Sequence, residues 1–117
     1  MSKIKLFLLS IVTFSLVTTV AWAYSYDITI PVKGKTITNE QLQKDSLFTV
    51  YSFAMRAASP TCTDFSIADT KVSKAKLNGK WQEIWTIKAC EKTALVPITF
   101  TDKNTYFIDP MGVRYAK

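Results

Sequence analysis

Residues 71–90, KVSKAKLNGKWQEIWTIKAC, decide the fold predicted for this chain. Asn78 and Gly79 separate two runs in which apolar and polar residues alternate. An Asn-Gly pair between such runs is the strongest short-range signal for a β-hairpin with a two-residue turn. The sequence therefore predicts an antiparallel hairpin here, and the turn sets which residues of its strands lie opposite each other.

The predicted register places Leu77 opposite Lys80 and Lys74 opposite Glu83. One face of the hairpin carries both tryptophans and presents Val72, Lys74, Lys76, Trp81, Glu83, Trp85 and Ile87. The other face presents Ser73, Ala75, Leu77, Gln82, Ile84, Thr86, Lys88 and Cys90.

The two tryptophans are expected to have different surroundings. Trp85 and Ile87 lie deeper along the strand and are expected to face a helix in the core. Trp81 lies beside the turn and is expected to be the exposed aromatic side chain, the one that meets a partner.

Glu83 supports three interpretations. As a general acid in an aromatic groove it would act on a sugar. Glycoside hydrolysis usually needs a second carboxylate at a set distance, however, and no pairing is evident among Asp64, Asp69, Glu91, Asp102 and Asp109. The favoured interpretation pairs Glu83 with Lys74 across the strands and covers Trp81 with the stem of Lys76. The third makes the ribbon of Lys74, Lys76, Trp81 and Glu83 a contact surface for a partner, and it stays open.

A helix is predicted in residues 36–60, TITNEQLQKDSLFTVYSFAMRAASP. Thr38 as N-cap and Gln41 three residues later form a capping box, and Ile37 and Leu42 form a hydrophobic staple. Pro60 ends the helix. The pattern therefore predicts about 18 helical residues.

The predicted helix is amphipathic. Its polar stripe consists of Asp45, Thr49, Ser52 and Arg56. The opposite face consists of Leu47, Val50, Tyr51, Ala54 and Ala58, widened by Phe48 and Met55. A helix that binds membrane surfaces usually carries several basic residues in its polar stripe, and this stripe carries only Arg56. We therefore expect the helix to pack on a sheet.

Period-two alternation continues on both sides of the hairpin, in residues 61–70, 94–100 and 104–108. Residues 26–35 read as a short edge strand or arm, and the tail 109–117 as partly loose. The predicted fold class is α+β, with one long amphipathic helix packed on an antiparallel meander of about four strands and one disulfide.

Residues 1–23 read as a secretory signal peptide, with Lys3 and Lys5 before an apolar stretch and Ala21-Trp22-Ala23 as the cleavage site. An uncleaved membrane anchor is the alternative. The expected organisation is therefore a signal peptide at 1–23, an arm or edge strand at 24–37 and a single domain at 38–117. The expected location is the periplasm or the outside of the cell.

Cys62 and Cys90 are the two cysteines of the chain and, in an exported protein, are expected to form a disulfide. On the chain-entropy model, closing that loop contributes about 3–4 kcal/mol. A metal-binding or redox-active pair is disfavoured because the spacing is not CxxC and the chain contains no histidine.

The composition excludes several chemistries. Without histidine there is no Ser-His-Asp or Cys-His site and no histidine-based metal site. The three glycines are isolated, so no phosphate-binding loop is expected. The formal charge of +6 falls to +4 when Lys3 and Lys5 are removed. We therefore expect no enzyme, no metal and no cofactor, and the export signal disfavours nucleic acid as a partner.

The segment from Lys80 to Ile108 resembles the C-terminal half of small exported proteins found among proteobacteria, generally without assigned function. The resemblance rests on Trp81-x-Glu83-x-Trp85, Cys90, VPITF and Asp102. It implies a bacterial periplasmic location and suggests no particular activity. The order of helix and meander is also similar to cystatin-like folds, as architecture only.

The sequence as a whole predicts an exported, non-enzymatic binding or accessory module. Its expected partner is another envelope or secreted protein, with the chain acting as an inhibitor, an immunity factor or a secretion accessory. The alternative partner is an anionic envelope glycan or lipid that contacts Lys74, Lys76 and Trp81. A small hydrolase is the least favoured function.

Overall fold

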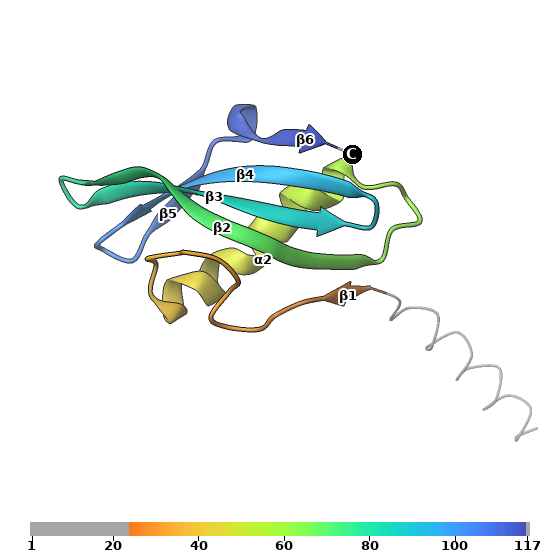
Figure 1. The fold of residues 1–117 in the computed structure, drawn as a ribbon, viewed down its shortest axis with the longest axis horizontal. Coiled ribbons are helices and arrows are strands. Elements are labelled where there is room, and N and C mark those ends of the chain that lie inside the picture. The colour runs from red at the N-terminus through yellow and green to blue at the C-terminus, as the bar shows by residue number, and fades with distance from the viewer. Residues whose placement is uncertain (1–23, 117) are drawn as a thin grey trace, which may run out of the picture.

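The computed structural model describes residues 24–116, so the predicted signal peptide lies outside the described residues. One helix, α2 (Glu40–Ala57), packs on a sheet (Figure 1). The strands are β1 (Ser25–Tyr26), β2 (Asp64–Leu77), β3 (Lys80–Ala89), β4 (Lys92–Thr101), β5 (Tyr106–Ile108) and β6 (Arg114–Ala116). A single 3-10 turn, η1 (Pro110–Gly112), precedes β6.

The sheet confirms the predicted meander. Strands β2, β3, β4 and β5 follow one another in space as in sequence, each antiparallel to the next. The short β1 pairs parallel with the start of β2, and β6 pairs with β4 beyond the end of β5. The prediction that the tail is loose was wrong for residues 110–116, because β6 joins the sheet and the Tyr115 hydroxyl donates to the Phe53 carbonyl.

The helix has the predicted length but a different N-cap. Asn39 is the N-cap residue, and its Oδ1 accepts a hydrogen bond from the Leu42 amide at 2.8 Å. The predicted capping box at Thr38 was wrong because the Thr38 hydroxyl donates to Glu83 instead. The predicted staple was wrong too, since Ile37 is 57% exposed. Asn is at least as good an N-cap as Thr, so shifting the cap by one residue has little cost.

The apolar face of α2 is narrower than predicted. The residues that it buries against the sheet are Leu42, Leu47, Val50, Tyr51 and Ala54. Phe48 and Met55 are exposed and do not widen this face. They flank Tyr26 of the N-terminal arm, whose ring lies 6.1 Å from that of Phe48 and whose hydroxyl donates to the Met55 sulfur.

Alternate residues of β3 and β4 point toward α2 and form the core. From β3 these are Trp81, Glu83, Trp85, Ile87 and Ala89, and from β4 they are Ala94, Val96, Ile98 and Phe100. The predicted positions of Trp85 and Ile87 in the core are confirmed.

The register of the β2–β3 hairpin matches the prediction only at the turn. Leu77 lies opposite Lys80, but Lys74 lies opposite Gln82 and Val72 lies opposite Glu83. The register shifts three times along this pair of strands, and at each shift β2 contains one extra residue, as in a β-bulge. The predicted pairing of Lys74 with Glu83 was therefore wrong, and Lys74 lies on the opposite face of the hairpin.

The predicted disulfide between Cys62 and Cys90 is present, with their Cα atoms 5.9 Å apart. It joins the link after α2 to the two-residue turn between β3 and β4. Within residues 24–116, no helix is long and apolar enough to cross a membrane.

Candidate binding surface on the β2–β3 hairpin

Glu83 is fully buried, and its carboxylate accepts four hydrogen bonds. Both tryptophans of the Trp-x-Glu-x-Trp run donate through Nε1, Trp81 at 2.9 Å and Trp85 at 3.0 Å. The Thr38 hydroxyl donates at 2.7 Å and the Ile37 amide at 3.2 Å. Residues two apart on a strand point to the same face, which is why both indoles reach the carboxylate between them.

This geometry makes Glu83 a structural residue. A buried carboxylate is tolerated when donors surround it, and here three donors reach Oε2 and one reaches Oε1. A general acid must reach the proton-accepting atom of a substrate, and a side chain with no exposed surface cannot do so. The carboxylate instead holds residues 37 and 38, just before α2, against β3.

Trp81 is only 7% exposed, so the prediction that it is the exposed aromatic side chain was wrong. Its indole N–H turns inward to Glu83, and its ring stacks on Phe100 with centroids 5.9 Å apart. A buried indole N–H usually requires an acceptor, and Glu83 supplies one below the turn. The prediction that Lys76 covers Trp81 is confirmed in part, since the Lys76 ammonium lies 5.2 Å from the centre of the Trp81 ring.

A second buried polar residue, Thr70, holds the loop that precedes α2. Its hydroxyl donates to the Lys33 carbonyl and accepts from the Thr36 amide, and its carbonyl accepts from the Lys35 amide. Gly34, between Lys33 and Lys35, has a φ of +104°, and a Cβ on Gly34 would lie 2.3 Å from the Thr70 amide nitrogen. Only glycine permits this close approach.

Two titrating groups with shifted pKa values, Asp27 of the arm and Tyr51 of α2, lie where the arm meets the helix. Hydrogen bonds from Thr29, including one from its backbone amide at 3.0 Å, hold the pKa of Asp27 below its usual value. Burial, aided by the negative charge of Asp27, raises the pKa of the Tyr51 phenol above its usual value. The Tyr51 hydroxyl donates to the Asp27 carbonyl and so fastens the arm to α2.

Beside Trp81 the surface is hollowed, and this hollow has a volume of about 280 Å³. It is lined by Lys74, Ala75, Leu77, Lys80, Trp81, Gln82 and Thr99. We call it the hairpin hollow. Of the predicted contact residues, Lys74 and Trp81 line it and Lys76 lies over the Trp81 ring, whereas Glu83 is buried and lies outside the lining.

Sequence reasoning did not select Lys80 and Leu77 as contact residues. The charge pattern could have indicated Lys80, because residues 70–82 contain four lysines and no carboxylate. Leu77 is 73% exposed although it is apolar, and only its place next to the turn hints at this.

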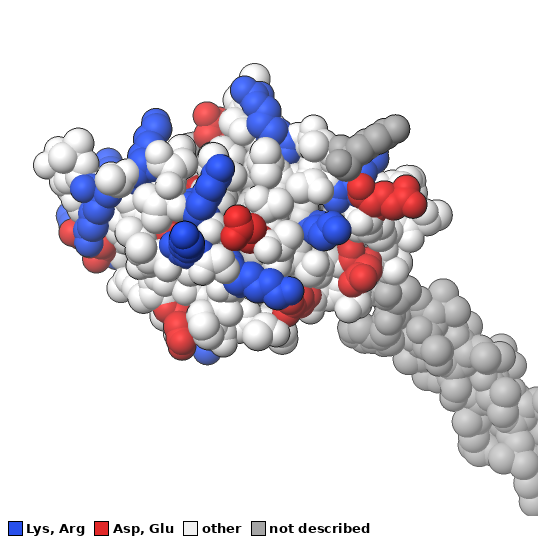
Figure 2. All heavy atoms as spheres, viewed as in Figure 1, with Lys and Arg blue, Asp and Glu red and all other residues white. Residues whose placement is uncertain are grey.

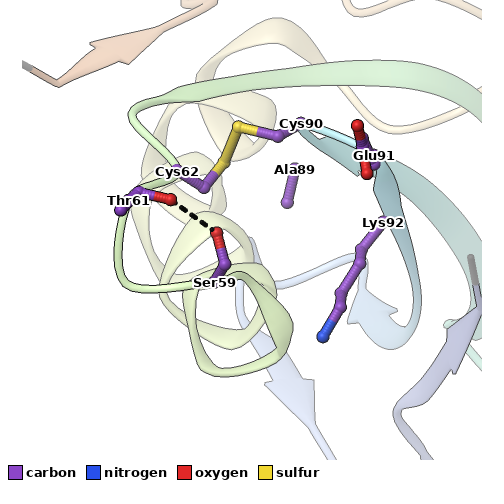
Figure 3. A pocket seen from close by; sticks show the side chains of 7 residues that line it. All are labelled: Ser59, Thr61, Cys62, Ala89, Cys90, Glu91 and Lys92. Atoms are coloured by element: carbon purple, nitrogen blue, oxygen red, sulfur yellow. Dashed lines mark hydrogen bonds between the residues drawn. A yellow bond between two sulfur atoms is a disulfide. The ribbon is translucent and has the colours of Figure 1, made fainter.

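A second hollow, of about 300 Å³, lies beside the disulfide (Figure 3). Its lining consists of Ser59, Thr61, Cys62, Ala89, Cys90, Glu91 and Lys92. One side chain of each charge, Glu91 and Lys92, lies on it, so its electrostatics do not select an anion or a cation. Among residues 24–116, no three acidic or sulfur-bearing side chains cluster as metal ligands would.

Comparisons with protein-family models, curated proteins and solved structures found no match to this chain. The resemblance to small exported proteins therefore stays a prediction.

Proposed function

We propose that this protein is an exported, non-enzymatic binding or accessory module that contacts another protein through the hairpin hollow. The observation that carries the proposal is the hollow itself, which lies near the end of a projecting hairpin with Lys74 and Lys80 in its lining. Figure 1 shows the β2–β3 turn at one end of the molecule, beyond the end of α2.

The base of the hairpin suits this role because it is rigid. Glu83 joins both tryptophans of β3 to the segment before α2, and Thr70 of β2 holds the preceding loop. A surface that is already in its bound conformation loses less entropy when it binds. The buried network thus supports binding at the hairpin tip and disfavours catalysis by Glu83.

The exported location is part of the proposal. It is supported by the apolar leader in residues 1–23 and by the disulfide, since disulfides persist in oxidising compartments such as the periplasm. In that setting the partner is an envelope or secreted protein.

Site-specific photo-crosslinking in the producing cell tests the proposal. One variant carries the photoreactive residue at Leu77, and the matched control carries it at Met111, which is 84% exposed but lies on η1. We expect a discrete protein adduct from position 77 that is absent from position 111. Adducts of equal yield at both positions, or at neither, would contradict the proposal.

Substitution of Trp81 is a poor test of the surface. Trp81→Ala removes a buried ring and one donor to Glu83, so it would reduce stability and binding together. Exposed residues of the hairpin avoid this difficulty, because surface substitutions usually change stability by no more than about 0.5 kcal/mol.

A further inference from the structure

We infer that the hairpin hollow binds an acidic segment of the partner protein, with an apolar side chain of that segment lying against Leu77. This inference rests on the proposed function and adds the chemistry of the partner. Its basis is the combination, in the lining of one hollow, of apolar residues and two lysines.

The charge of the surroundings is strongly one-sided. Lys71, Lys74, Lys76 and Lys80 all lie in the outer half of the hairpin, and residues 70–82 contain no carboxylate. Figure 2 shows basic side chains at the end of the molecule where the hairpin projects, with a small acidic patch near them. Asp102 is the carboxylate that lies against the turn, within 2.6 Å of the position that a Cβ on Gly79 would take. The excess of cations favours an acidic partner and speeds its association.

The apolar residues in the lining of the hollow are Ala75, Leu77 and Trp81. Leu77 is 73% exposed and supplies the apolar contact, whereas Trp81 is only 7% exposed and faces α2. The Lys76 ammonium already lies over the Trp81 ring, which shows that the ring accepts a cationic neighbour without leaving the core. An apolar side chain that enters the hollow would cover Leu77, and neighbouring carboxylates would reach Lys74 and Lys80.

Addition of a partner strand to the free edge of β2 is disfavoured. Backbone bonds to the N-terminal segment reach β2 at Phe65 and Thr70, and the more distal part of β2 has register shifts on both sides of Lys74. Bulges and lysines are the usual devices that protect an edge strand from pairing. Side-chain contacts in the hollow therefore suit this surface better than a new β-ladder.

The same charges disfavour a second copy of the chain as the partner, because two hairpin tips would bring lysines against lysines. An anionic membrane would also attract the lysines. The hollow is concave, however, and Leu77 is the one large apolar side chain that is exposed between residues 71 and 80. A concave site with one exposed apolar residue fits an inserted side chain better than a flat bilayer.

Titration with synthetic peptides tests this inference, with intrinsic tryptophan fluorescence as the readout because Trp81 lines the hollow. The probe is a twelve-residue peptide of Glu, Asp, Leu and Phe. Its control has the same length and apolar residues but Gln and Asn in place of the acids. We expect the acidic peptide to bind at least about tenfold more tightly than the neutral one, and its affinity to fall as salt is raised.

The matched variants are Lys74→Glu with Lys80→Glu and, as control, Lys44→Glu with Lys88→Glu. All four lysines are exposed, and the control pair lies on α2 and at the end of β3 away from the hairpin turn. We expect the hairpin double variant to weaken binding of the acidic peptide by about tenfold or more, and the control double variant to weaken it by less than about twofold. Circular dichroism spectra identical to wild type would show that both variants fold.

Three results would overturn the inference: equal binding of the acidic and neutral peptides, equal loss in both variants, or binding to anionic phosphatidylglycerol vesicles without binding to the peptide. The crosslinking experiment separates this failure from failure of the proposed function. A protein adduct at position 77 together with equal binding of the acidic and neutral peptides would support the binding surface and refute only the acidic character of the partner.

Discussion

The two halves of the β2–β3 hairpin share a turn and a pair of strands but differ in what covers them. In the inner half, Glu83 and Thr70 are buried under α2 and its preceding loop, and each makes several hydrogen bonds. In the outer half, the lysines and Leu77 are exposed. The difference shows how a small domain can satisfy a buried carboxyl group with its own donors in one place and offer charges to a partner a few residues away.

The largest expected effect on stability comes from a substitution in the inner half of the hairpin. Glu83→Ala leaves four donors without their acceptor, three of them buried and the Ile37 amide partly buried, and each unsatisfied buried group costs about 1–3 kcal/mol. We expect the free energy of unfolding to fall by about 3 kcal/mol or more, measured by urea denaturation. Asp69→Ala, on an exposed side chain of the neighbouring strand, is the control and should change it by less than about 0.5 kcal/mol. A similarly small loss of unfolding free energy in Glu83→Ala would refute the stabilising role of the hydrogen bonds to Glu83.

The next effect concerns the loop that covers the inner half. Gly34→Ala places a Cβ against the Thr70 backbone at a positive φ, so the loop must shift. We expect a loss of about 1–3 kcal/mol in the same denaturation assay. Gly112→Ala places a Cβ 3.0 Å from the side chain of Pro97 and 4.0 Å from that of Asp109, meets no backbone atom there, and should cost less. The reverse order would show that the loop is not held by Thr70.

A smaller effect comes from the arm beyond that loop. The folded-state pKa of Asp27 is lowered, so its charged form is the one that the fold stabilises. This contribution is present above the unfolded pKa of about 3.9 and is lost as pH falls through the lower folded value. Because Asp27 lies near the surface, we expect Asp27→Asn to lower the melting temperature slightly at pH 6 and by less at pH 3. A difference that grows toward pH 3 would contradict this sign.

The smallest expected effect is in the outer half. Lys74→Ala, Lys76→Ala and Lys80→Ala, singly, should each change the free energy of unfolding by less than about 0.5 kcal/mol, because their charged ends lie in water. Lys76 is the informative member, since its contact with Trp81 adds at most a modest stabilisation at an exposed site. A large loss at any of the three would mean that the outer half is part of the core.

Local signals predicted the elements but not their exact fit. The Asn78-Gly79 turn, the helix between the capping residues and Pro60, and the Cys62–Cys90 disulfide all depend on residues near in sequence or on simple counting. The bulges in β2 have no such signature. A shift of one residue moves a strand's side chains to the other face, so the predicted partner of Glu83 was wrong although the turn was right.

The candidate surface was predicted in part for the same reason. Lys74, Lys76, Trp81 and Glu83 were selected from the ribbon, and of these four only Lys74 and Trp81 line the hollow. The exposure of Trp81 was mispredicted because its burial depends on Glu83, Phe100 and the segment before α2. The position of Trp81 next to the turn, on which the prediction relied, does not reveal these contacts.

By itself the sequence determined the α+β class, the hairpin, the helix, the disulfide and the absence of histidine chemistry. These follow from local propensity, periodicity and composition, which act without knowledge of the fold. The tertiary structure decided that Thr38 binds Glu83 while Asn39 caps the helix, that Trp81 turns inward, and that Lys74 and Lys80 share one hollow. The physical reason is that a buried carboxylate must find its donors wherever the fold places them, and those donors come from residues 37–85 of the chain.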